Sequence, residues 1–151
     1  MPDIVVRIAR GDALPGPLGL TFRSPEILLA MTDEERAMYG GTAVVPLWAD
    51  GNSDHVVAHD DGSGMFVRID VEEGLDLLTA PRLDWQQVLV ADFLSMYELE
   101  SEDGAFRELA RQFGFEHAEE IIEAHAAGDL STSESHDSWM AALLRRIGAR
   151  S

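Results

Sequence analysis

The sequence contains no cysteine and no lysine, and these absences narrow the chemistry that the chain can perform. Without cysteine there is no disulfide, no thiolate metal centre and no cysteine nucleophile. No run of about 18 apolar residues occurs, so no transmembrane helix is predicted. The N-terminal residues lack the basic region and the long apolar stretch of a signal peptide, which favours a cytoplasmic location.

Negative charge is what the sequence has in excess, with 28 acidic residues against 11 arginines and a net charge of −17. Nucleic acids and anionic membranes are disfavoured as partners, because phosphate binding requires clustered arginine or lysine. A basic protein partner is favoured, since complementary electric fields accelerate association. Solubility alone is the competing explanation of the charge, and the composition leaves both explanations open.

The length of 151 residues and the hydrophobic content of 46% predict one folded domain spanning residues 1–151. Residues 1–41 are expected to contain a strand and short helices, residues 42–73 a β meander, and residues 84–151 helices. Because strands and helices are segregated along the chain, the predicted fold class is α+β. An antiparallel β-sheet meander in the N-terminal half packs against helices, and the C-terminal half is helical.

The first part of the chain opens with Ile4–Ala9, a β-branched run that predicts a strand. Ser24 before Pro25 predicts a capped helix start. Thr32 and Glu35 form the pattern of a capping box, which predicts a second short helix.

Three β-rich segments, residues 42–49, 54–60 and 65–72, are separated by the turn signals Asp-Gly-Asn-Ser and Asp-Gly-Ser-Gly. They predict a three-stranded antiparallel meander. Pro46 lacks a backbone donor, so the first segment is expected at the edge of the sheet or to begin after it. Polar and apolar residues alternate in the third segment, which predicts that one face of this strand is exposed.

Four helices are predicted in the last part of the chain. The first is opened by Asp84, with Gln87 as its capping-box partner. The second and third end at Gly114 and Gly128, and the last follows Ser135.

Acidic residues cluster where the first of these helices is predicted to end. Glu98, Glu100, Glu102 and Asp103 would oppose the helix dipole there. This small cost favours the hypothesis that the cluster serves a partner.

Residues 48–55 begin like a calcium loop, with Asp50, Asn52 and Asp54 at its alternating ligand positions. His55 occupies the position where that loop needs glycine, and strands flank the segment where helices would be needed. A hairpin turn is therefore the preferred interpretation. No metal and no other cofactor is predicted.

A transition-metal site is the competing hypothesis for this region, because His55 and His59 are followed by Asp60 and Asp61. On a strand the two histidines lie about 13 Å apart, which is too far for one metal ion. A metal-assisted hydrolase using residues 55–61 is therefore the less favoured alternative. The sequence also lacks a Gly-x-Ser-x-Gly motif and a P-loop, so no enzyme activity and no catalytic residue is predicted.

The order of these segments resembles a known family. A glycine pair in Tyr39–Gly41 leads into Val44–Asp60, which combines a hydrophobic-proline strand with an aspartate-glycine turn. Gly64–Glu72 follows, and then a helix that opens with an aromatic residue, Trp85–Glu98. Over roughly residues 35–100 this order resembles the SUKH superfamily of bacterial immunity proteins, which is related to a fungal cell-wall regulator. The resemblance implies an α+β fold and a protein that binds and blocks a toxin, without catalytic residues.

Charge and resemblance together predict a non-catalytic acidic binding protein, an immunity protein whose toxin is basic and of the nuclease type. The alternative is a housekeeping or regulatory protein-interaction domain, and the oligomeric state is left open. The predicted partner-binding residues are an aromatic anchor and exposed acids near the turns: Trp48, Asp50, Asp54, Asp60, Asp61, Glu98, Glu100 and Asp103.

Overall fold

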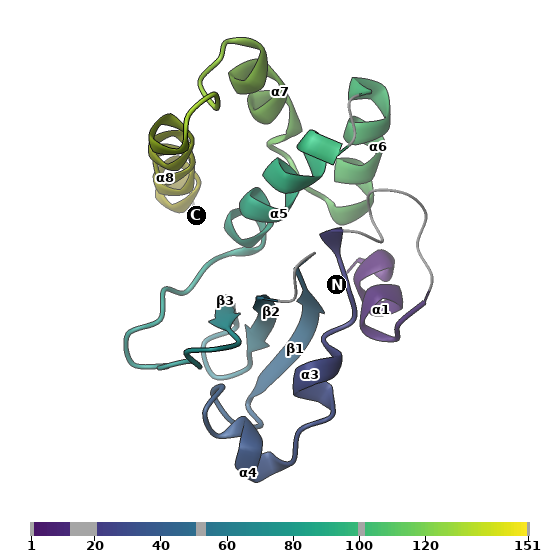
Figure 1. The fold of residues 1–151 in the computed structure, drawn as a ribbon, viewed down its shortest axis with the longest axis vertical. Helices are drawn as coiled ribbons and strands as arrows, with labels where there is room; N and C mark the ends of the chain where they lie inside the picture. Colours follow the sequence, from purple (N-terminus) through teal and green to yellow (C-terminus); the bar gives the residue numbers. More distant parts are fainter. Residues whose placement is uncertain (1, 13–20, 51–53, 100–101, 151) are drawn as a thin grey trace.

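The computed structural model describes residues 2–12, 21–50, 54–99 and 102–150 of the chain. Figure 1 shows a three-stranded sheet in the N-terminal half and a mainly helical C-terminal half, so the predicted α+β class is confirmed. None of the described helices has both the length and the apolar character needed to cross a membrane. In chain order the elements are α1 (Asp3–Ala9), α3 (Glu26–Leu29), α4 (Asp33–Arg36), β1 (Val44–Ala49), β2 (His55–Asp60), β3 (Met65–Asp70), α5 (Trp85–Leu99), α6 (Asp103–Phe113), α7 (Ala118–Ala126) and α8 (Ser133–Arg150).

The three strands form one antiparallel sheet in the order β1-β2-β3, as the turn signals predicted. Pro46 lies in the edge strand β1, which confirms the expectation from its missing donor. A bulge between Pro46 and Trp48 shifts the register on β2, and both Leu47 and Trp48 join the same core cluster. Part of the open edge is covered, because Arg23 and Ala49 exchange backbone hydrogen bonds of 2.9 and 2.7 Å.

Each face of the sheet is covered by its own apolar cluster. On one face, Trp48 and Val57 pack with α5 and the helices that follow it. On the opposite face, Val56 and Val67 pack with Leu28 of α3 and with the segment after β3. Because both faces are covered, the strands carry apolar side chains on both sides.

The face of β3 that was predicted to be exposed is half-buried, because α5 covers Phe66 and Arg68 while Asp70 stays accessible at the end of the strand. Phe66 lies with its ring centroid 5.2 Å from that of Trp85, the first residue of α5. Arg68 reaches Asp92 in the middle of the same helix. Arg68 is polar on this face because it has a buried carboxylate as its partner, and periodicity alone does not reveal such a partner.

The segment Ile4–Ala9 forms most of helix α1 and not the predicted strand. Ile4, Val5 and Ile8 are buried together at helical spacing, while Val6 is 45% exposed. β-branched residues lower helix propensity only slightly. Burial of three large side chains against the core outweighs that preference, as tertiary packing commonly does.

Both predicted capping boxes are confirmed. In α4, the Thr32 side chain accepts from the backbone N–H of Glu35, and the Glu35 carboxylate accepts from the backbone N–H of Thr32. Asp84 and Gln87 exchange the equivalent bonds, of 2.8 and 2.9 Å, at the start of α5. Each pair satisfies two N–H groups that the helix itself leaves without acceptors.

Two other predicted helix starts are corrected. The Ser24 hydroxyl donates to the carbonyl of Ala9 at 3.4 Å and does not cap α3. Helix α8 begins at Ser133, before the predicted start after Ser135, because the Thr132 hydroxyl accepts from the backbone N–H of Ser135.

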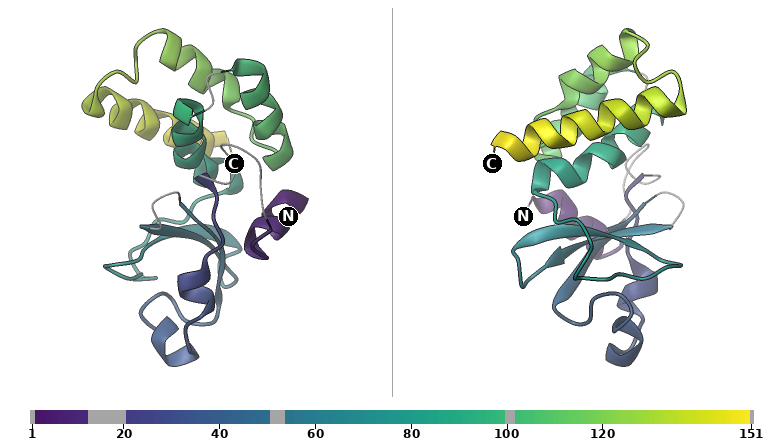
Figure 2. Two further views of the ribbon diagram at one scale, coloured as in Figure 1. Left: turned by 45° about the vertical axis from the view of Figure 1, so that its right-hand side comes forward. Right: turned by 90° about the vertical axis from the view of Figure 1, so that its left-hand side faces the viewer.

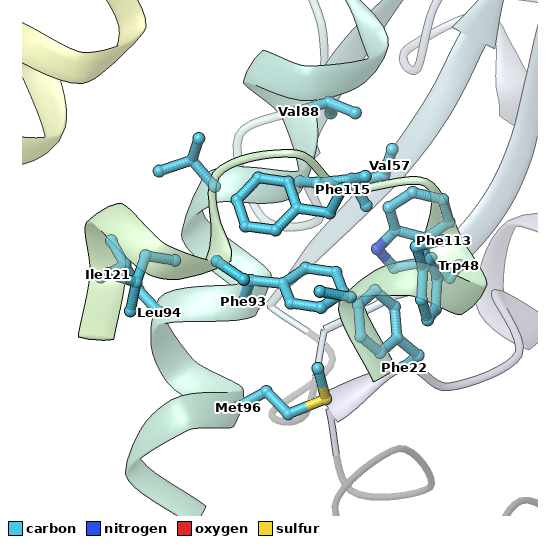
Figure 3. Close-up of a cluster of buried hydrophobic side chains, with 14 of the residues drawn as sticks. Phe22, Trp48, Val57, Val88, Phe93, Leu94, Met96, Phe113, Phe115 and Ile121 are labelled. Atoms are coloured by element: carbon cyan, nitrogen blue, oxygen red, sulfur yellow. The ribbon is translucent and has the colours of Figure 1, made fainter. Parts of the chain in front are cut away.

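An aromatic cluster joins β1 to α5 and α6 (Figure 3). The Phe22 ring has its centroid 5.5 Å from that of Trp48, 5.9 Å from Phe93 and 4.5 Å from Phe113. Phe115 stacks on Phe93 at 4.6 Å. All five rings are buried, and such ring pairs stabilise a core beyond the area that they remove from water.

One charged side chain, Asp92 of α5, is buried beside this cluster. Its carboxylate accepts from Trp48 Nε1 at 3.0 Å and from the two terminal nitrogens of Arg68 at 3.3 and 3.0 Å. Burial raises the pKa of Asp92, while the positive charge of Arg68 and the indole hydrogen bond oppose that rise. The three side chains tie α5 to both β1 and β3.

Replacing Asp92 with alanine is expected to lower the free energy of unfolding by about 3–5 kcal/mol, because Arg68 and the Trp48 indole would lose their buried partner. Urea unfolding followed by far-UV circular dichroism measures this loss. The double variant Arg68→Met/Asp92→Leu should recover most of it, since no unpaired charge is left buried. A loss below about 1 kcal/mol for Asp92→Ala would contradict a structural role for this carboxylate.

Candidate partner-binding surface

Trp48, predicted as an exposed aromatic anchor, is completely buried. It points onto the sheet face that α5 covers, where its ring contacts Phe22 and Trp85 at centroid distances of 5.5 and 5.8 Å. Its indole N–H is bound to Asp92. The expectation that Trp48 faces a partner is therefore wrong, because every part of the side chain is used inside the fold.

Asp60 was also predicted to be exposed, but only 5% of it is. Its carboxylate accepts from the Ser63 hydroxyl at 2.8 Å, from Arg82 Nε at 2.9 Å and from the backbone N–H of Gly62 at 3.1 Å. The hydrogen bond from Ser63 is the largest cause that lowers the pKa of Asp60, followed by Arg82 and Gly62. Asp60 closes the β2–β3 turn and ties the segment before α5 to the sheet.

Asp61 is exposed, and its Oδ1 lies 2.7 Å from His59 Nδ1. His55 lies at the opposite end of β2, beside Asp50 and Asp70, about 13 Å along the strand from His59. The two histidines therefore belong to different places on the surface. Over the residues that the structure describes, no three His, Asp or Glu side chains are arranged to hold a metal ion.

Five acidic residues lie where β1 ends, β2 begins and β3 ends. His55 lies among them, with Nδ1 3.4 Å from Asp50 and Nε2 3.8 Å from Asp70. Asp54 is adjacent, because its backbone N–H donates to Asp50 Oδ1 at 2.9 Å. We call this surface the acidic sheet end, and its carboxylates are those of Asp50, Asp54, Asp70, Glu72 and Glu73.

Hydrogen bonds to the backbone hold the acidic sheet end in place. The Asp70 carboxylate accepts from the backbone N–H groups of Glu73 and Glu72 at 3.0 and 2.9 Å, and these bonds lower the pKa of Asp70. The backbone N–H of Val71 donates to the carbonyl of Asp54 at 3.0 Å, which joins the two loops. The side chains of Asp54, Glu72 and Glu73 form no hydrogen bond or ion pair with another described residue, so they are left for solvent or a partner.

Positive charge does not compensate this surface. Arg68 precedes Asp70 by two residues on the same face of β3, but it is bound to Asp92. Within the described ranges, no arginine lies at ion-pair distance from any of the five carboxylates. His55 is the basic side chain placed to interact with them.

No protein-family model matches this chain, and neither a curated protein nor a solved structure matches it. The resemblance to the SUKH superfamily over roughly residues 35–100 therefore stays a prediction. Function is inferred from the charge and geometry of the chain's own residues.

Two of the four acids predicted to cluster at the end of α5 are used within the fold. The Glu102 carboxylate caps α6 by accepting from two backbone N–H groups of its first turn. Asp103 accepts from the Tyr97 hydroxyl at 2.8 Å, and this bond is the largest cause that raises the pKa of Tyr97. Glu102 and Asp103 thus belong to the N-terminus of α6, where their charge favours the helix dipole, and not to the end of α5 as expected. Glu98 is exposed, and Glu100 lies outside the described residues.

Sequence reasoning missed three members of the acidic sheet end, namely Asp70, Glu72 and Glu73. The signal was present in the meander itself, because an antiparallel third strand ends where the second begins. The observed register pairs His55 with Asp70. Applying that register to the predicted strands would have brought the acids after the third strand next to Asp50.

Replacing Asp60 with asparagine should alter the acid limb of the stability profile. Its folded pKa lies below the ordinary value of 3.8, so its ionised form stabilises the fold above that pH. This stabilisation is lost as the pH falls through the folded pKa. Urea unfolding midpoints should therefore be lower for Asp60→Asn than for the parent at neutral pH, and the gap should narrow between about pH 5 and pH 2.

Asp61→Asn is the matched control for this experiment, because Asp61 is its exposed neighbour in the same turn. It should leave the profile close to that of the parent. A gap between Asp60→Asn and the parent that stays constant across this pH range would contradict the assigned role of the carboxylate.

Proposed function

We propose that this chain is a non-catalytic binding protein that neutralises a basic toxin, as an immunity protein does. The observation that carries the proposal is the acidic sheet end, where five carboxylates share one surface and no arginine of the described chain pairs with them. The resemblance to the SUKH superfamily supports the same function, because that superfamily is one of toxin-binding proteins.

An uncompensated acidic surface suits a cationic protein for two reasons. Its field attracts the partner over a distance and can accelerate association by roughly 10–10³. Asp50 and Asp70 are also held by hydrogen bonds to backbone groups, so binding would order few additional side chains.

Burial of Trp48 changes how the partner is expected to bind. A buried indole cannot supply the aromatic anchor that dominates many interfaces. Affinity at the acidic sheet end is therefore expected to depend on charge, and to fall as salt screens the exposed carboxylates. Of the other residues predicted for binding, Asp61 and Glu98 are exposed and could extend the contact.

Co-expression tests the proposed function. The gene that neighbours the gene of this chain is expressed alone and together with this chain, and growth is measured. Toxicity of the neighbour alone, restored growth with this chain and a complex of the two proteins are the expected results. A harmless neighbour, or one that is equally toxic in both cases, overturns the immunity function and favours a housekeeping interaction domain.

The double variant Asp54→Asn/Glu72→Gln should weaken the complex by about tenfold or more at low salt. Both side chains are exposed and form no hydrogen bond or ion pair with another residue that the structure describes, so the loss reports on the partner. Isothermal titration calorimetry at about 50 and about 300 mM salt should show that the difference shrinks as screening increases.

The matched control is Asp33→Asn/Glu34→Gln on α4, which also removes two exposed charges. It should keep the affinity within about twofold of the parent. Equal effects of the two variants would mean that total charge, and not the acidic sheet end, determines binding.

A further inference from the structure

A groove with a volume of about 290 Å³ lies between α7 and α8. Figure 2 shows α8 running back across α5 after the turn that follows α7. The α7 side of the groove is formed by Glu120, Glu123, Ala124 and Ala127, whose spacing of three and four residues places them on one helix face. The two alanines leave space that larger side chains would fill. We call this feature the α7–α8 groove.

Trp139 supplies the aromatic wall of the α7–α8 groove from the side of α8. It is partly buried and packs against the main core, so its position is fixed. Its indole N–H donates no hydrogen bond to any described residue, whereas those of Trp48 and Trp85 donate to Asp92 and to the carbonyl of Phe113. Trp139 thus differs from the two tryptophans whose polar atom is used within the fold.

The charges that line the groove are mostly negative. Arg146 of α8 donates to the Glu120 carboxylate at 3.1 Å, so these two charges compensate each other. Glu123 and Asp129 are exposed, and their carboxylates form no ion pair with another described residue. Two uncompensated carboxylates therefore line the groove together with an aromatic ring.

We propose that the α7–α8 groove receives an arginine side chain of a partner protein. The planar guanidinium stacks on the Trp139 ring, and its N–H groups donate to the carboxylates of Glu123 and Asp129. An arginine fits better than a lysine, because an ammonium group has no flat face and no forked donors. An anionic ligand is disfavoured by the charge of the lining.

This proposal rests on the proposed function, since it assigns a second contact to the same basic partner.

Titration of the ¹⁵N-labelled full chain with N-acetyl-arginine N′-methylamide tests the chemistry of the groove. The indole N–H signal of Trp139 is identified by its absence from the Trp139→Phe variant. That signal should shift saturably, while those of Trp48 and Trp85 stay in place. The corresponding citrulline derivative has the same shape without the charge and should produce no shift.

The double variant Glu123→Gln/Asp129→Asn should weaken binding of the arginine probe by about tenfold or more. The control Glu116→Gln/Glu134→Gln removes two exposed charges outside the groove and should change binding by less than about twofold. Equal binding of the arginine and citrulline probes, or full binding by the first variant, overturns the proposal. Displacement of the arginine probe by spermidine at a far lower concentration also overturns it, because a free polyamine would then be the better ligand.

The complex with the neighbouring gene product separates this inference from the proposed function. A complex that Glu123→Gln/Asp129→Asn weakens supports the groove contact. A complex that the same variant leaves unchanged overturns the contact but keeps the acidic sheet end as a binding surface. Binding of the arginine probe at Trp139, without a complex between this chain and the neighbouring gene product, supports the arginine site in the groove. It overturns only the assignment of that gene product as the partner.

Discussion

The buried carboxylate of Asp92 is the constraint on which the arrangement of sheet and helices depends. It lies where α5 crosses the sheet, and it is the acceptor for side chains from two different strands. A charge that is removed from water is costly unless it is paired and hydrogen-bonded, so α5 can dock only where Arg68 and Trp48 meet it. The aromatic cluster supplies the apolar contacts around Asp92, and the hydrogen bonds of Asp92 determine how α5 is aligned on the sheet.

Arginines that form ion pairs inside the fold are not available to pair with carboxylates on the surface. With 11 arginines against 28 acids, few cations are left to pair with the carboxylates of the surface. Arg68 is held by Asp92, and Arg82 is held by Asp60 and two backbone carbonyls. Arg68, which lies two residues before Asp70 on β3, is therefore not available to pair with the acidic sheet end. Stability and surface charge are coupled through these few side chains.

Local signals along the chain predicted the elements that local chemistry determines. The capping box of Thr32, the turn residues of the meander and the edge position of Pro46 depend on neighbours in sequence or on the backbone of one residue. The segment of helix α1 was wrongly predicted as a strand, because the residues that pack against its buried face come from distant parts of the chain. The prediction that Trp48 is exposed was wrong for the same reason, since the acceptor of its indole N–H lies 44 residues away in the sequence.

The candidate surface was predicted in part. Asp50 and Asp54 were identified from the turn, and the structure brings them together with Asp70. Asp60 was assigned to the surface as an acid near a turn, although Ser63 and Arg82 hydrogen-bond to it and it is buried. Acidic residues of one type thus serve opposite purposes, and only their partners in space distinguish them.

These purposes are divided between separate sets of residues. Asp60 and Asp92 hold the fold, while Asp54, Glu72 and Glu73 are attached to the same frame without supporting it through their side chains. Mutations can therefore accumulate in the second set at little cost in stability. On the proposed function, a lineage that carries this domain can change its partner while its architecture is inherited unaltered.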